Sequence, residues 1–120
     1  MFSNLYALVK DVAGVQAVLG NPVRLYRFGQ APQDVAKPYA VQQTIAGQPE
    51  NYLGERPDQD TLLVQVDVYA ADMAGARAIV TALAAAIEPH THITSWNGEF
   101  FEPDTKLQRI SFTVDLKVDR

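Results

Sequence analysis

The residues best placed to support metal chemistry are two histidines near the middle of the second half of the chain. His90 and His92 are separated by one residue, so in an extended segment both imidazoles lie on one side, a spacing that a metal ion can use. No further set of ligands is close to them in the sequence. We therefore interpret them as solvent-exposed histidines that follow a helix, and we expect no metal site.

A second candidate is the acidic segment 47–60, which has no hydrophobic periodicity. Its charged residues are Glu50, Glu55, Asp58 and Asp60, with Arg56 as the one base. Paired carboxylates can act in acid/base catalysis or bind a hard cation. Catalytic carboxylates, however, need a rigid and partly buried setting, and this segment holds two glycines and two prolines. A charged mobile loop is the better interpretation.

Composition and missing motifs narrow the classes of function. The sequence contains no G-x-S-x-G, P-loop or G-x-G-x-x-G pattern and no cysteine, so we expect neither an enzyme nor a cofactor. The net charge of −4 and the absence of a basic run argue against sequence-specific nucleic-acid binding. No apolar run is long enough for a membrane span or a signal peptide. We expect one cytosolic domain over residues 1–120.

These residues must be positioned by the stretch 61–89, which predicts a strand followed closely by a helix. Apolar residues alternate along the strand at Leu62, Val64, Val66, Val68 and Ala70. Asp72 stands at the N-cap position of the helix, and Pro89 ends it. The apolar stripe of the helix consists of Met73, Ala76, Ile79, Val80, Leu83 and Ile87.

The other elements are predicted from shorter patterns. Ser3 can cap a first helix that ends at Gly14, followed by a short helical turn at 15–19. We expect strands at 23–28, 39–46 and 110–118. The remaining extended region, 93–102, contains Asn97-Gly98, which favours a tight hairpin turn.

Together the elements predict an α+β fold of two layers. We expect a mainly antiparallel sheet of four to five strands with two helices packed on one face. Asp67 and Asp115 lie on outward faces and meet if their strands pair, with Arg109, Lys117 or a cation of a neighbouring subunit between them. We place Trp96 in the core. With Tyr69, Phe100 and Phe101, it is also a candidate for an exposed apolar patch.

Read in order, several segments resemble the tail completion, or tail terminator, proteins of long-tailed bacteriophages. The resemblance covers nearly the whole chain. It is carried by the short strand Arg24-Leu25-Tyr26, by Ala31-Pro32 and Pro38-Tyr39-Ala40-Val41, by the run from Val64 to Ala70 (VQVDVYA), by Ala76-Arg77, and by Arg109, Ser111 and Phe112. Gly75 within the helix and the acidic segment 47–60 depart from the pattern.

The resemblance implies a structural protein of the virion tail that is assembled in the bacterial cytoplasm. Such proteins form a ring, typically of six subunits, that caps the tail tube, ends its polymerisation and offers a surface for joining the head. The implied partners are further copies of the chain, the tail tube protein and the head-tail connector protein. No catalytic, cofactor or metal site is implied.

We expect the interface residues on the strand, the helix and the acidic segment. The match at Asp67 and Arg77 suggests an ion pair within or between subunits, with Tyr69 beside it. The segment 47–60 is available to contact a partner through Tyr52, Leu53, Glu50, Glu55 and Arg56. The alternative is a small-ligand binding or regulatory domain, which requires a pocket between sheet and helices lined by Trp96 or Tyr69.

Overall fold

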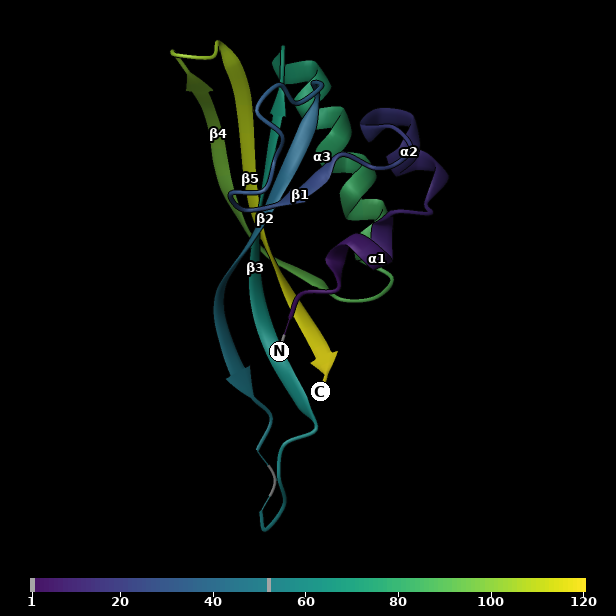
Figure 1. The fold of residues 1–120 in the computed structure, drawn as a ribbon, viewed down its shortest axis with the longest axis vertical. Helices are drawn as coiled ribbons and strands as arrows, with labels where there is room; N and C mark the ends of the chain where they lie inside the picture. The colour runs from purple at the N-terminus through teal and green to yellow at the C-terminus, as the bar shows by residue number, and fades with distance from the viewer. Residues whose placement is uncertain (1, 52) are drawn as a thin grey trace.

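The computed structural model describes residues 2–51 and 53–120. One layer of the fold is a sheet and the other is formed by helices (Figure 1). In chain order the elements are α1 (Leu5–Val9), α2 (Ala13–Leu19), β1 (Leu25–Arg27), β2 (Tyr39–Pro49), β3 (Gln59–Ala70), α3 (Met73–Ile87), β4 (His92–Glu102) and β5 (Leu107–Asp119). None of the helices in the described residues is long and apolar enough to cross a membrane.

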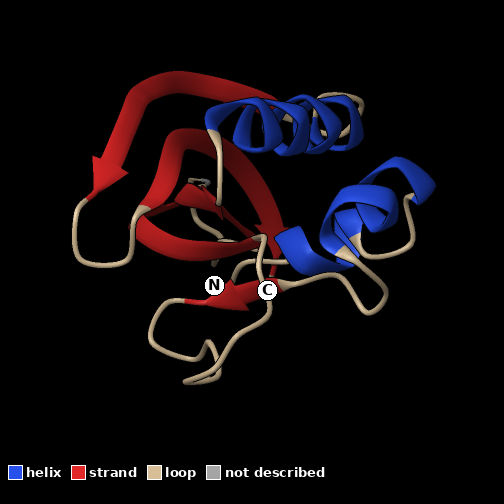
Figure 2. Ribbon diagram, turned by 90° about the horizontal axis from the view of Figure 1, so that it is seen from above, coloured by secondary structure: helices blue, strands red, loops and turns tan. Residues whose placement is uncertain are grey.

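The sheet has five strands in the order β1-β2-β3-β5-β4, and it is strongly curved (Figure 2). Among the strand pairs of the described residues, β1 and β2 run parallel and the other neighbours are antiparallel. The predicted α+β class and mainly antiparallel sheet are confirmed. The helices lie on one face, as expected, but they number three in the described residues rather than two.

The core lies between the sheet and α3. Every second residue of β3 from Asp60 to Ala70 is buried, as its alternating sequence predicts. The buried stripe of α3 packs against these side chains, and Phe112 of β5 is fully buried beside them. Asp72 caps α3 as predicted, because its Oδ1 accepts the Gly75 N–H at 2.6 Å.

The N-terminal prediction of one helix ending at Gly14 is wrong. The chain breaks between α1 and α2 at Val12, which is extended, and Gly14 lies inside α2. The break turns the chain so that both short helices bury apolar residues in the same cluster, Val9 from α1 and Val15 from α2. Ser3 does bond the start of α1: its Oγ accepts the Leu5 N–H at 3.2 Å.

Two connections also differ from expectation. Strand β2 runs on to Pro49 and β3 begins at Gln59, so the two ends of the segment 47–60 belong to a β-hairpin, and only its middle is the expected loop. Pro49 fits there because β1 pairs only with residues 40–42, which leaves this end of β2 as a free sheet edge. This hairpin, described over 46–51 and 53–63 and called the arm below, projects beyond the rest of the molecule (Figure 1).

The hairpin turn predicted at Asn97-Gly98 is wrong as well. Strand β4 continues through this pair, and the ladder with β5 shifts register between Trp96 and Gly98. Gly98 has φ 114°, which a bulge can use and other residues rarely adopt. The irregular edge also leaves Trp96 61% exposed, so its predicted core position is wrong.

Candidate interaction surface on the open sheet face

The sheet face that is not covered by helices, called the open face below, carries a row of large side chains that crosses all five strands. Strand pairing places Tyr39 opposite Tyr69, Tyr69 opposite Arg109, and Arg109 opposite Phe100. Tyr26 of β1 extends the row beyond Tyr39. These five residues are called the aromatic row below.

Three pairs of neighbouring side chains in the aromatic row are in ring contact. The Tyr39 and Tyr69 rings stack with centroids 5.0 Å apart and an interplanar angle of 17°. The Tyr26 and Tyr39 centroids are 6.4 Å apart. At the other end the Arg109 guanidinium lies 4.4 Å from the centroid of Phe100, a cation–π geometry. These ring contacts order the side chains at both ends of the row.

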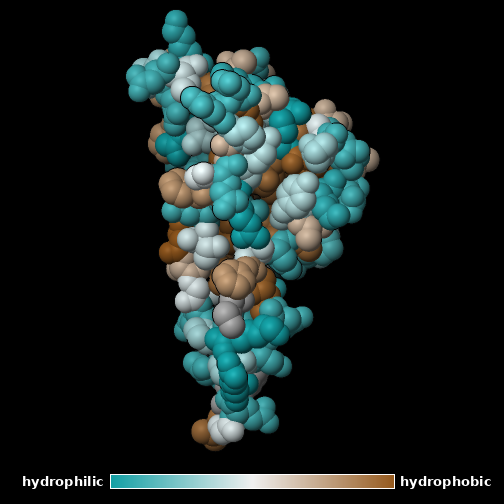
Figure 3. Space-filling view, viewed as in Figure 1, coloured by the Kyte–Doolittle hydropathy of each residue, from teal (hydrophilic) through white to brown (hydrophobic). Residues whose placement is uncertain are grey.

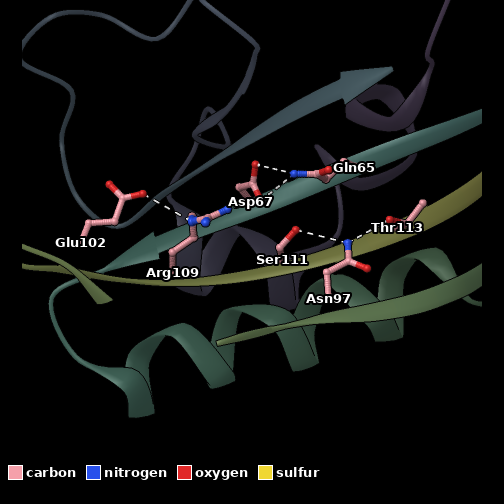
Figure 4. Close-up of polar contacts among 7 residues, drawn as sticks. All are labelled: Gln65, Asp67, Asn97, Glu102, Arg109, Ser111 and Thr113. Atoms are coloured by element: carbon pink, nitrogen blue, oxygen red, sulfur yellow. Dashed lines mark hydrogen bonds and ion pairs between the residues drawn. The ribbon is translucent and has the colours of Figure 1, made fainter. Parts of the chain in front are cut away.

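Arg109 also joins two acids on this face (Figure 4). Its Nη1 is 3.3 Å from Asp67 Oδ1, and its Nε is 3.3 Å from Glu102 Oε1. The side chains of Arg109 and Asp67 are only 25% and 14% exposed, so this pair is shielded from solvent. The Gln65 amide donates to both oxygens of Asp67, at 3.3 and 3.2 Å.

A second polar cluster lies where the bulged part of β4 folds over β5. The Asn97 amide donates to Ser111 Oγ at 3.3 Å and to Thr113 Oγ1 at 3.0 Å (Figure 4). Ser95 Oγ donates to the side-chain Oδ1 of Asn97 at 2.8 Å. Ser111 and Thr113 are buried although they are polar, and these bonds satisfy them. The Asn97-Gly98 pair therefore holds β4 against β5 and does not form a turn.

The acids and the partial burial change the ionisation of the tyrosines. Burial, together with the nearby negative charge of Asp67, raises the pKa of Tyr69 to about 12. Burial and the charge of Glu102 also raise the pKa of Tyr39. Both phenols are therefore neutral hydrogen-bonding groups at physiological pH.

The two residues suggested as an ion pair do not meet within the chain. Asp67 lies on the open face, whereas α3, which carries Arg77, packs on the opposite face. Arg77 instead forms an exposed pair with Glu99 of β4 at 2.9 Å. A contact between Asp67 and Arg77 of different subunits stays a prediction.

The prediction that Asp67 and Asp115 meet across the sheet is wrong. Strands β3 and β5 do pair, but their register does not place the two acids opposite each other. Asp67 lies opposite Ser111, and Asp115 lies opposite Leu63. Their strands thus keep the carboxylates apart. Of the cations expected between the two acids, Arg109 pairs with Asp67 alone.

The residues predicted to contact a partner lie on the arm. The arm is largely hydrophilic on the face seen in Figure 3, with apolar atoms at its free end, where Leu53 is fully exposed. Glu55 and Arg56 are exposed too. Glu50 is tied to the arm, since it accepts the Thr61 hydroxyl. Tyr52 lies outside the described residues.

The residues considered for metal or ligand binding do not converge. His90 and His92 are exposed, and no group of three or more histidine or acidic side chains in 2–51 and 53–120 is placed to hold a metal ion. Tyr69 faces away from the helices and Trp96 is exposed, so neither lines a pocket between sheet and helices. A hollow of about 590 Å³ lies instead beside β1, lined in part by Tyr6, Arg24 and Arg27.

Sequence reasoning missed Tyr26 and Tyr39 as members of the surface. Both were assigned to strands, but nothing local distinguishes them from other strand tyrosines. Only the register of β2 with β3, and of β1 with β2, brings their rings together.

Comparison with known proteins identifies the class to which this architecture belongs, a structural protein of bacteriophage tails. The family model described as "Tail completion protein gp17" matches residues 3–119. The chain therefore belongs to the tail completion protein gp17 family. The resemblance inferred from the sequence is confirmed.

Solved structures show the same fold. A chain of the virion of the native gene transfer agent (GTA) particle superposes with a TM-score of 0.65. Its sequence is 14% identical, and the match covers 97% of the present chain and 92% of that chain. Among curated proteins, none matches this sequence.

Proposed function

We propose that the protein is a tail terminator: copies of it form a closed ring of six that caps the tail tube, stops tube polymerisation and presents a surface for head-to-tail joining. The observation that carries this proposal is the family match over residues 3–119. The shared fold with a chain of a gene transfer agent virion supports it. The whole of residues 1–120 acts as one domain in this proposal.

The proposed partners are other copies of the chain in the ring, the tail tube protein on one side and the head-tail connector protein on the other. Assembly takes place in the host cytoplasm, and the finished ring stays in the virion tail. These functions depend on shape and surface chemistry, which the open face and the arm supply.

The arm is the part of the molecule that we assign to a partner ring. It extends beyond the body, so it can reach past the plane of its own ring. Its end carries Leu53, an apolar side chain with no cover within the described residues. An exposed leucine on a polar arm is suited to enter an apolar recess on a partner. Tyr52, its neighbour in sequence, belongs to the same proposed contact.

The test is a tube-capping assay with Leu53→Ser and with Phe2→Ser as the matched control, since Phe2 is 77% exposed outside the arm. Purified tail tube protein is polymerised with each variant, and tube lengths are measured by negative-stain electron microscopy. We expect wild type and Phe2→Ser to limit tube length, and Leu53→Ser to lose capping while its melting temperature is unchanged. Normal capping by Leu53→Ser would remove the arm from the contact.

A further inference from the structure

We propose that a hollow on the open face, at the point where the arm joins the body, receives a lysine or arginine side chain from a neighbouring copy of the chain. Asp115 of β5 is the acceptor of that cation. This inference rests on the proposed ring and names the chemistry of one contact within it.

Asp115 is a half-buried acid whose charge is not compensated by the described residues. It lies on the open face, because its neighbours Val114 and Leu116 are buried in the core on the other side of β5. Its Oδ1 is buried and accepts no hydrogen bond in the described part of the chain. No ion pair of residues 2–51 and 53–120 involves Asp115 either. A buried carboxylate oxygen without a donor costs free energy, so it calls for a partner.

Cations of the same subunit do not supply this partner. Lys117, two residues farther along β5, lies 4.0 Å from Glu50 Oε1 instead. Arg109 is held by the two acids at its own end of the open face. His92 is the cross-strand neighbour of Asp115 on β4, but its side chain is exposed and forms no ion pair within the described residues. We therefore expect the cation from outside the subunit.

The shape of the site suits a long cationic side chain. Asp115 lines a hollow of about 360 Å³, and the other lining residues are uncharged and belong to the paired ends of β2 and β3. They are Ala46, Gly47, Gln48, Thr61 and Leu63. Ala46 lies opposite Leu63 in the ladder, so both side chains are on the same face as Asp115. Lysine and arginine pack their methylene groups on apolar surface while the charged head reaches a polar partner.

The position of the hollow favours a neighbouring copy over the partner ring as the source of the cation. The end of the arm, which is assigned to the partner ring, projects away from the body (Figure 1). Leu53 lies five residues beyond Gln48, and extended chain advances by about 3.3 Å per residue, so this end reaches up to roughly 16 Å past the hollow. A neighbour within the same ring lies beside the body, at the level of the hollow.

The chain itself carries cations that are available for this contact. Three of them are exposed, lie outside the arm and form no ion pair within the described residues. They are Arg27, Lys37 and Lys106. A cation on one surface that enters an acidic hollow on another makes a heterologous contact, which propagates head to tail and closes when the rotation between subunits allows it.

The first test separates the effect of Asp115 on the single subunit from its effect on the assembly. Asp115→Asn keeps the size of the side chain and removes the charge. Because the carboxylate has no cation in the subunit, the variant should melt at the temperature of wild type or above it. In native mass spectrometry it should need at least about tenfold more protein to form rings, since the neighbour's cation loses its partner. The matched control is Asp34→Asn, an exposed acid without an ion pair in the described residues, which should change neither property.

The second test identifies the cation by charge reversal. Asp115→Lys should prevent ring formation, and one of Arg27→Glu, Lys37→Glu or Lys106→Glu on the same chain should restore it. Arg56→Glu, on the arm, is the control that should not restore rings. Circular dichroism and melting curves establish that each variant is folded before it is compared.

The failures of the two proposals are distinguishable. Rings of wild-type stability from both Asp115→Asn and Asp115→Lys would overturn this inference and leave the proposed ring intact. Normal rings from Asp115→Asn that no longer cap tail tubes would also overturn it, by assigning the cation to the tube protein. If none of the three reversals restored the rings of Asp115→Lys, a neighbouring copy would be excluded as the source. A wild type that is monomeric at every concentration would overturn both proposals.

Discussion

Replacing Arg109 by methionine tests whether the shielded ion pair on the open face stabilises the fold. Methionine keeps the length of the side chain and its packing on Phe100, but it leaves Asp67 without its cation. The Asp67 side chain is only 14% exposed, so water compensates the loss poorly. Losing a hydrogen-bonded charge partner in such a setting costs about 2 kcal/mol of unfolding free energy.

This free energy converts to a shift in melting temperature that is easy to measure. A chain of 120 residues has an unfolding entropy of roughly 0.25 kcal/mol/K, so Arg109→Met should melt about 8 °C below wild type. The matched control is Arg77→Met, which breaks the pair with Glu99, whose side chains are 65% and 45% exposed. That exposed pair should contribute less than ~0.5 kcal/mol, or about 2 °C.

A double-mutant cycle separates charge from packing. Adding Asp67→Asn to Arg109→Met removes the uncompensated carboxylate, and we expect about half of the lost stability to return. Thermal and urea unfolding followed by circular dichroism provide the measurement. The reasoning is refuted if Arg109→Met and Arg77→Met lower the melting temperature equally, because burial would then make no difference.

Two further predictions concern ionisation and the cap of α3. The pKa of Tyr69 is about 12 in the folded protein against 10.0 for a free phenol, so the unfolded chain loses its proton first as pH rises. Stability should fall by roughly 1 kcal/mol between pH 9 and 11, after allowance for partial exposure, and Tyr69→Phe should remove this part of the fall in urea titrations at both pH values. Asp72→Ala removes the acceptor of the Gly75 N–H and should cost ~1 kcal/mol, whereas Asp72→Asn should keep most of the stability; equal losses in denaturant midpoints would exclude a capping role.

The parts of the fold that the sequence predicts are those with one buried and one exposed face. Strand β3 and helix α3 were placed within two residues of their observed bounds because Val64, Val66 and Ile79 repeat with the period of the element. The end of β2 in the arm has no such signal. Residues 44–49 are exposed on both faces, so no hydrophobic alternation marks them as strand.

The errors around β4 have a different physical cause. Asn97-Gly98 suits a tight turn and also suits a bulge, since both use a residue with positive φ. Local sequence does not distinguish a tight turn from a bulge. The bulge forms because Asn97 bonds to Ser111 and Thr113 of β5. The predicted core position of Trp96 fails because β4, which carries it, is the edge strand of the sheet. The aromatic row was equally beyond prediction, because it depends on the order and register of all five strands.

The position of β3 between β2 and β5 also determines the order in which the chain can fold. Strand β3 pairs with β2 through a local hairpin. Its other edge pairs with β5, which follows α3 and β4 in the sequence. Until β5 (residues 107–119) has been synthesised, the strand that contains Val64, Val66 and Val68 has one unpaired edge. Unpaired apolar strand edges promote the aggregation of folding intermediates. A fragment that stops before Leu107 should therefore aggregate when expressed alone, even though it contains α1, α2, α3 and the arm.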